Sequence, residues 1–122
     1  MPHTINWNKE GVEVKFRGLL RPEDILTVND ILYRDSRFDT INYQLYDFLE
    51  VDEVNGSEVD VELIGTIDKQ ISIWNNKFKG VILAKDPQLI ELLSVYKELL
   101  EGTNWQIKIF KNIESANEWI NS

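Results

Sequence analysis

The sequence predicts an α/β fold, with a five-stranded and mostly parallel sheet, an antiparallel hairpin at its start, and four helices. Strand-like and helix-like segments take turns along the chain, which is the pattern of βα units. The chain ends in alternating apolar residues at 105–110, followed at once by a short amphipathic helix over 112–120. No linker, internal repeat or low-complexity segment divides the 122 residues, so we expect one domain over residues 1–122.

The first two strands form the hairpin. Ile5 and Trp7 alternate with polar residues, and after a Gly-containing turn at residues 8–11 the alternation resumes from Val12 to Phe16. Two runs of period two across a short turn predict an antiparallel pair with one face toward solvent.

The first helix begins at Pro22, because a proline loses nothing in a first turn where its N–H would have no partner. Ile25, Val28 and Leu32 repeat at helical spacing and predict a helix that ends before Phe38.

Residues 41–48 form the next strand, with alternate side chains on opposite faces of the sheet. One face carries Tyr43 and Leu45, and the other carries Gln44, Tyr46 and Phe48.

An acidic loop is expected next, and then a long helix that starts at Ser57. Ser57 and Asp60 form a variant capping box, in which each caps the other's backbone N–H. We attribute Gly65, inside this helix, to a close approach of the helix to the sheet. The spacing predicts a buried stripe of Val59, Leu63, Ile67, Ile71 and Trp74.

Residues 81–84 are apolar at every position, which predicts a central strand covered on both faces. Asp86 and Pro87 then begin the most regular helix of the chain, and Gly102 follows its end. The buried stripe of that helix is Leu89, Leu93, Tyr96 and Leu100.

The last strand places Trp105, Ile107 and Ile109 on one face, and Asn112 caps the last helix. Every strand after the hairpin is reached through a helix, so these strands are expected to be parallel with right-handed crossovers. Most aromatic side chains fall on inward stripes and are expected in the core. Four others could instead line the rim of a groove: Trp74, Phe78, Tyr43 and Tyr46.

Composition excludes several classes of protein. The formal net charge of −8 argues against nucleic-acid binding, which needs Lys and Arg to neutralise phosphates. The absence of cysteine excludes disulfides, thiolate nucleophiles and sulfur-ligated zinc, and it fits the cytoplasm. No apolar run is long enough to span a membrane, and residues 1–6 lack the pattern of a signal peptide.

No catalytic, cofactor or metal site is predicted. His3 is the only histidine and has no nucleophile placed beside it, and no glycine-rich phosphate loop is present. An EF-hand alignment with Gly56 at its sixth position puts Val51, which cannot bind calcium, at the first. We therefore expect a protein that is not an enzyme and holds no cofactor.

The strongest departure from an average composition is a run of acids. No basic residue lies between Arg37 and Lys69. Such a run is most often a solvated surface, and the sharper interpretation is a surface that steers a basic protein partner toward the chain. The candidate partner surface consists of Asp47, Glu50, Asp52, Glu53, Glu58 and Asp60.

Two segments resemble a known family. The turn Gly18-Leu19-Leu20-Arg21-Pro22-Glu23-Asp24 and the ending from Phe110 to Ile120, with Glu114, Ala116 and Trp119, are similar to those of SpoIIAA-like proteins. These have the STAS domain of anti-sigma-factor antagonists, which is related to the CRAL-TRIO lipid-binding fold. The resemblance implies a bacterial, cytoplasmic, non-catalytic interaction module, of the kind that acts as a partner-switch regulator. The CRAL-TRIO relation implies the alternative of a domain that binds a lipid or another apolar small molecule.

The family's antagonists are phosphorylated on a serine within Asp-Ser-Ser-Gly, at the start of the helix after the third strand. The matching position in this chain is Ser57, within Asn55-Gly56-Ser57-Glu58, so the motif itself is missing. Ser57 is therefore an N-cap by local sequence and a phosphorylation site only by resemblance. The oligomeric state, monomer or homodimer, stays open.

Overall fold

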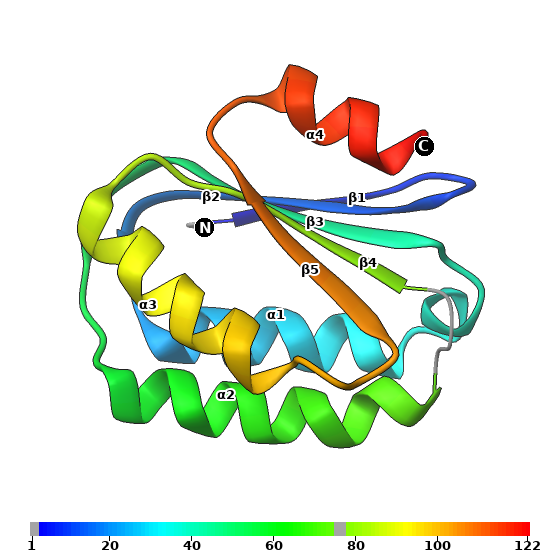
Figure 1. Cartoon of the computed structure of the whole chain (residues 1–122), viewed down its shortest axis with the longest axis horizontal. Helices are drawn as coiled ribbons and strands as arrows, with labels where there is room; N and C mark the ends of the chain where they lie inside the picture. Colours follow the sequence, from blue (N-terminus) through cyan, green and yellow to red (C-terminus); the bar gives the residue numbers. More distant parts are fainter. Residues whose placement is uncertain (1–2, 75–77) are drawn as a thin grey trace.

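The computed structural model describes residues 3–74 and 78–122 and contains one five-stranded sheet (Figure 1). The strands follow one another across the sheet in chain order, with β1 antiparallel to β2 and every other neighbouring pair parallel. This confirms the predicted fold class. The strands are β1 (His3–Trp7), β2 (Gly11–Leu20), β3 (Tyr43–Val54), β4 (Phe78–Leu83) and β5 (Trp105–Phe110).

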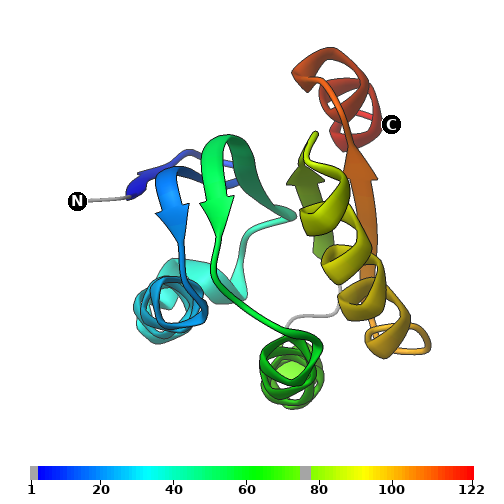
Figure 2. The same ribbon diagram turned by 90° about the vertical axis from the view of Figure 1, so that its left-hand side faces the viewer.

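Four helices cover the two faces of the sheet unequally. The first three lie together on one face and α4 lies on the other (Figures 1 and 2). Two short 3-10 helices, η1 (Ser36–Asp39) and η2 (Ser72–Trp74), follow α1 and α2. The helices are α1 (Pro22–Arg34), α2 (Glu58–Ile71), α3 (Pro87–Leu99) and α4 (Ile113–Ile120).

Each face of the sheet has its own core, as the alternation along β3 predicted. Tyr46 and Phe48 belong to the large core beneath α1, α2 and α3. Tyr43 and Leu45 belong to a smaller core that Ala116 of α4 closes. The central position of β4 is also confirmed, because residues 81–84 are each at most 7% exposed.

The helix ends follow the predicted local chemistry. Pro22 and Pro87 are the first residues of α1 and α3. The carboxylate of Asp86 accepts the Leu89 N–H at 2.9 Å. At α4, the side chain of Asn112 accepts an N–H in the same way. These side chains satisfy backbone donors that the first turn of a helix leaves without partners.

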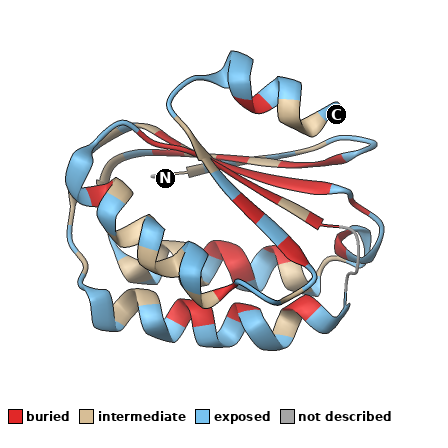
Figure 3. Cartoon of the chain, viewed as in Figure 1, coloured by how far each residue is buried: buried red, intermediate tan, exposed pale blue. Residues whose placement is uncertain are grey.

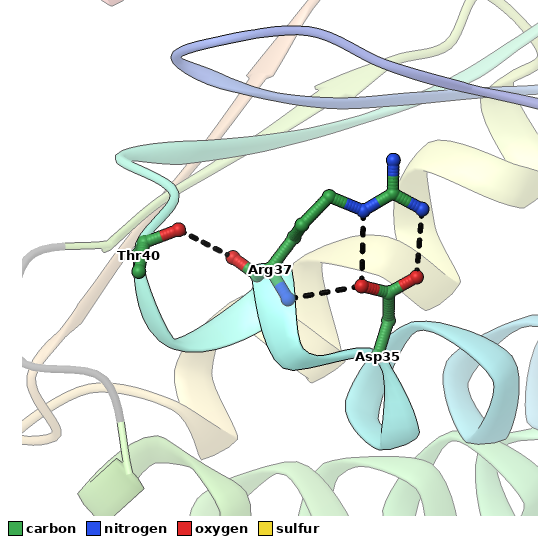
Figure 4. A network of polar contacts seen from close by, with 3 residues as sticks. All are labelled: Asp35, Arg37 and Thr40. Carbon is green, nitrogen blue, oxygen red and sulfur yellow. Dashed lines mark hydrogen bonds and ion pairs between the residues drawn. The ribbon is translucent and has the colours of Figure 1, made fainter.

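A compact polar turn joins α1 to β3 (Figure 4). Asp35 accepts three hydrogen bonds from Arg37, one from its backbone N–H and two from its guanidinium, at 2.8–3.0 Å. The Arg37 bonds lower the pKa of Asp35 to about 2. The same guanidinium lies 4.3 Å from the ring centre of Trp7, so this turn also covers the end of β1.

The predicted acidic loop is wrong. Strand β3 continues through Asp52 and Glu53 to Val54, because the long strand β2 pairs with it as far as Leu20. Two irregularities in the β2–β3 register accompany this extension. Glu50, Asp52 and Glu53 therefore lie on a strand and not in a loop.

The predicted buried stripe of α2 is also largely wrong. Val59 is 73% exposed, Leu63 is 53% exposed and Ile67 is 38% exposed, and of the predicted stripe within α2 only Ile71 packs against the large core. The buried residues of α2 are instead Ile64, Gly65 and Asp68. Figure 3 shows that exposed and buried residues alternate along this helix. The prediction that Trp74 is buried fails too, since it is 69% exposed.

Gly65 has a different reason from the one expected. A Cβ atom at Gly65 would lie 2.8 Å from Cδ1 of Leu99 on α3, so this glycine permits close packing of two helices and does not touch the sheet. This contact orients α2, because the side that carries Gly65 must face α3.

Candidate functional site

The outward side of α2 is the main exposed apolar surface of the described chain. We define the α2 surface as Val59, Leu63 and Ile67, spaced at four residues, together with Ile73 and Trp74 of η2. Ile73 is 70% exposed. Elsewhere in the part of the chain that the structure describes, the exposed large apolar residues are Ile31 and Ile113, on other helices.

The predicted acidic residues fall into two groups. Asp47 and Glu50 lie within β3, and Asp47 accepts the backbone N–H of Leu49 at 2.9 Å. Glu50 pairs with Lys15 and lies 3.6 Å from Arg17, and these bonds lower the pKa of Glu50, Lys15 being the main cause. Two cations on β2 therefore partly neutralise the middle of the predicted surface.

The second group lies where β3 leads into α2. Asp52 and Glu53 are exposed at the end of β3, and Glu58 is exposed in the first turn of α2. Glu62 is exposed one turn further along, next in sequence to Leu63. Of these acids, Glu58 and Glu62 lie at the N-terminal end of the α2 surface, because they belong to the first two turns of α2. The sequence analysis did not identify this neighbourhood because it placed the apolar stripe inside.

Ser57 is the N-cap residue of α2, as expected, and Asp60 supplies the capping acceptor. The Asp60 carboxylate accepts the Ser57 backbone N–H at 2.9 Å and its hydroxyl at 3.1 Å. The Ser57 side chain is exposed. Its phosphorylation stays a prediction.

A buried carboxylate on the inward side of α2 was missed by the sequence analysis. Asp68 is 2% exposed. The Tyr33 hydroxyl of α1 donates to its Oδ1 at 2.7 Å, and the Tyr96 hydroxyl of α3 donates to its Oδ2 at 2.7 Å. Asp68 therefore ties three helices together. A signal was available, since an acid four residues after Ile64 extends an inward apolar stripe.

Burial determines the acid–base behaviour of this cluster. Removal from water raises the pKa of Asp68 to about 6, and the two tyrosine hydrogen bonds act against that rise. Burial and then the neighbouring Asp68 charge raise the pKa of Tyr96 far above its usual value, and the same causes act on Tyr33. Nearby, the Tyr46 hydroxyl donates to Oδ1 of Asn29 in the large core.

The described residues contain neither a helix that could span a membrane nor a group of side chains that could bind a metal ion. No helix within residues 3–74 and 78–122 has the length and apolar content needed to cross a membrane. In the same residues, no three His, Cys, Asp or Glu side chains are grouped so that they could hold a metal ion.

Solved structures share the arrangement of this chain. SpoIIAA, the anti-sigma factor antagonist in its unphosphorylated form, matches with a TM-score of 0.62 at 9% identity over 98% of both chains. The chain has the SpoIIAA-like fold. The Bacillus cell fate determinant SpoIIAA in its phosphorylated form matches with a TM-score of 0.59 at 9% identity, over 96% of this chain and 98% of that one.

A third structure with the SpoIIAA-like fold shows more sequence similarity. It is an uncharacterised protein of the DUF3478 family from Shewanella loihica PV-4, with a TM-score of 0.58 at 18% identity over 97% of this chain and 91% of that one. No protein-family model matches the sequence. No curated protein matches it at a significant level.

Proposed function

We propose that this protein is a non-catalytic protein-interaction module that binds its partner through the α2 surface. The observation that supports this most directly is the row Val59, Leu63 and Ile67, exposed on a helix that already packs its other side against α3. A helix with apolar residues on both sides is typical of one that is covered on both sides.

The energetics favour a partner. Burying a large aliphatic side chain contributes about 1.5–3 kcal/mol. Trp74 is 69% exposed at the end of this row, and Trp is among the residues that most often dominate binding energies at interfaces. Together these side chains supply an apolar centre of the kind around which stable interfaces form.

The neighbouring charges define the partner's chemistry. Glu58 and Glu62 are exposed at the N-terminal end of the α2 surface, Glu53 is exposed at the end of the preceding strand, and the net charge of the chain is −8. The expected partner is a protein with an apolar groove whose border is basic at the end that meets the start of α2. An electrostatic field from charges of one sign speeds the association of an oppositely charged partner. Salt weakens this effect, since the Debye length is only about 8 Å at physiological ionic strength.

The fold comparisons support a regulator as the type of module. One matched structure is described as an anti-sigma factor antagonist, a protein that acts on another protein. The proposal therefore includes three further points: the module acts as a partner switch, it is located in the cytoplasm, and it has no catalytic activity.

The test compares two surface variants during capture of proteins from a bacterial lysate. Leu63→Gln combined with Ile67→Gln should lose the partner, while Ile31→Gln should retain it. Ile31 is a matched control, because it is 45% exposed but lies on α1 outside the α2 surface. The partner that meets this criterion is then purified and its Kd measured with each variant.

Charge reversal gives a second readout. Asp52→Lys with Glu53→Lys should slow association at least threefold in low salt and leave dissociation nearly unchanged. Glu50 is left intact, because its ion pairs with Lys15 and Arg17 join β2 to β3. Equal capture by the wild type and the Leu63/Ile67 variant would refute the proposal. A concentration-dependent dimer that Leu63→Gln abolishes would replace the outside partner with a second copy of the chain.

A further inference from the structure

A cavity of about 70 Å³ lies in the large core, on the inward side of α2. Figure 2 shows the setting, with α2 between α1 and α3 beneath the sheet. Its walls come from α1, α2 and α3 and from β3, β4 and β5, and they are mainly apolar, with aliphatic and aromatic side chains. They include Ile25, Val61, Ile64, Ile82, Leu93 and Ile107.

Two polar groups in this cavity accept hydrogen bonds. Gln44 is 8% exposed, and its Oε1 is buried with no hydrogen-bond partner among the described residues. Asp68 also lines the cavity, and its two tyrosine bonds leave part of the carboxylate's capacity of about four acceptor sites free. A buried acceptor without a hydrogen-bond donor costs free energy of folding. A ligand that brings a donor into the cavity would therefore be stabilised there.

The charge of Asp68 is also uncompensated. Within residues 3–74 and 78–122, no Lys, Arg or His forms an ion pair with Asp68. A buried carboxylate is stabilised best by a cation that also donates hydrogen bonds to it. A ligand that supplies a cationic donor would satisfy both Asp68 and Gln44.

A second cavity extends the first toward the surface. It measures about 50 Å³, and Ile25, Val61, Ile64 and Leu93 line both cavities. Its other walls include Arg21 and Ser57, which are exposed at the start of α1 and α2. The shared aliphatic side chains therefore lie between the first cavity, which Asp68 lines, and the second, which Arg21 and Ser57 line.

We propose that rotations of these shared side chains join the two cavities into one passage, and that the passage binds a small alkylammonium ion. Its ammonium group lies at Asp68 and Gln44, and its alkyl chain lies in the second cavity. One ordered water needs roughly 10–15 Å³ of such a cavity, so the first cavity has room for an ammonium group with its first carbon atoms. The aliphatic walls that follow match a short chain. This inference does not depend on the α2 surface, which lies on the opposite side of the helix.

The test measures binding of hexylammonium, 1-hexanol and hexanoate to the wild-type protein by calorimetry at neutral pH. Hexylammonium should bind at least tenfold more tightly than 1-hexanol, and hexanoate should not bind, because its charge repels Asp68. Propylammonium should bind more weakly, by about fourfold for each methylene removed.

Two variants locate the site. Asp68→Asn should abolish the preference for hexylammonium over 1-hexanol, and Gln44→Leu should weaken both by at least threefold. Glu62→Gln is the matched control, because it removes an exposed carboxylate from the same helix and should change neither Kd. Should Asp68→Asn fail to fold, Gln44→Leu alone decides.

Three outcomes would overturn the proposal. One is equal affinity of the wild type for the amine and the alcohol. Another is an unchanged Kd for hexylammonium in Gln44→Leu or in folded Asp68→Asn. The third is a loss of hexylammonium binding in Glu62→Gln, which would assign the binding to surface charge.

Discussion

Replacing Asp68 by Asn should change how the protein's stability depends on pH. Burial raises the pKa of Asp68 from an ordinary 3.8 to about 6, so between these pH values the folded chain holds a proton that the unfolded chain has released. The stability that this difference contributes is fully present below the unfolded pKa and is lost as pH rises through about 6. Asn has no such titration.

The expected magnitude follows from the two pKa values. One pKa unit corresponds to about 1.4 kcal/mol, so the wild type should lose about 2.5 kcal/mol relative to Asp68→Asn between pH 4 and pH 7. All other ionisable groups are common to both proteins and cancel in the difference. Asp68→Asn also changes the hydrogen bonds from Tyr33 and Tyr96, but that change in stability is the same at every pH in this range and does not alter the pH dependence.

The assay is urea unfolding followed by tryptophan fluorescence at several pH values from 4 to 8. Asp35→Asn is the control, because Arg37 holds the pKa of Asp35 near 2, below the window in which Asp68 titrates. Its difference from the wild type should be flat above about pH 5. A flat difference for Asp68→Asn, within about 0.5 kcal/mol, would show that the carboxylate is not buried as described.

Three further substitutions test the fold. Ile82→Asp should unfold the protein by circular dichroism, because an unpaired charge in the central strand costs several kcal/mol. Gly11→Ala should lower stability by about 1–3 kcal/mol in urea, because its Cβ would lie 2.5 Å from the backbone oxygen of Tyr43; wild-type stability in this variant would contradict the close packing of β2 against β3. Leu63→Gln with Ile67→Gln should change the free energy of unfolding by less than about 1 kcal/mol, since Leu63 is 53% exposed and Ile67 is 38% exposed, and a large loss would place them in a core.

The order of strands and helices could be predicted from the sequence because each element has a local signature. Pro22, Asp86 and Asn112 begin helices through their own side chains, and residues 81–84 identify a central strand by composition alone. The two faces of β3 follow from strict alternation. None of these features depends on what lies far away in the sequence.

The end of β3 could not be predicted because its cause is not local. Asp52 and Glu53 have low strand propensity. They are extended because β2 offers partners as far as Leu20, through a register with two irregularities. Only the length of the neighbouring strand decides this.

The Asp68 cluster was missed for the same reason. Its two hydrogen-bond donors, Tyr33 and Tyr96, are 35 and 28 residues away in the sequence. Each alone is an unremarkable aromatic residue of an amphipathic helix. The site exists only once three helices pack side by side on one face of the sheet.

Helix α2 explains both the principal error and the two proposals. It has one apolar row at Val59, Leu63 and Ile67 and another that includes Val61 and Ile64, so periodicity allows either to face the sheet. The close contact between Gly65 and Leu99 selects the second row, and the first is left on the surface. Because the two sides are separate, Leu63→Gln should affect partner binding but not alkylammonium binding, and Asp68→Asn should do the reverse. Loss of both activities in either single variant, with the fold retained, would mean that α2 couples its two sides, and partner binding would then respond to the ligand beneath it.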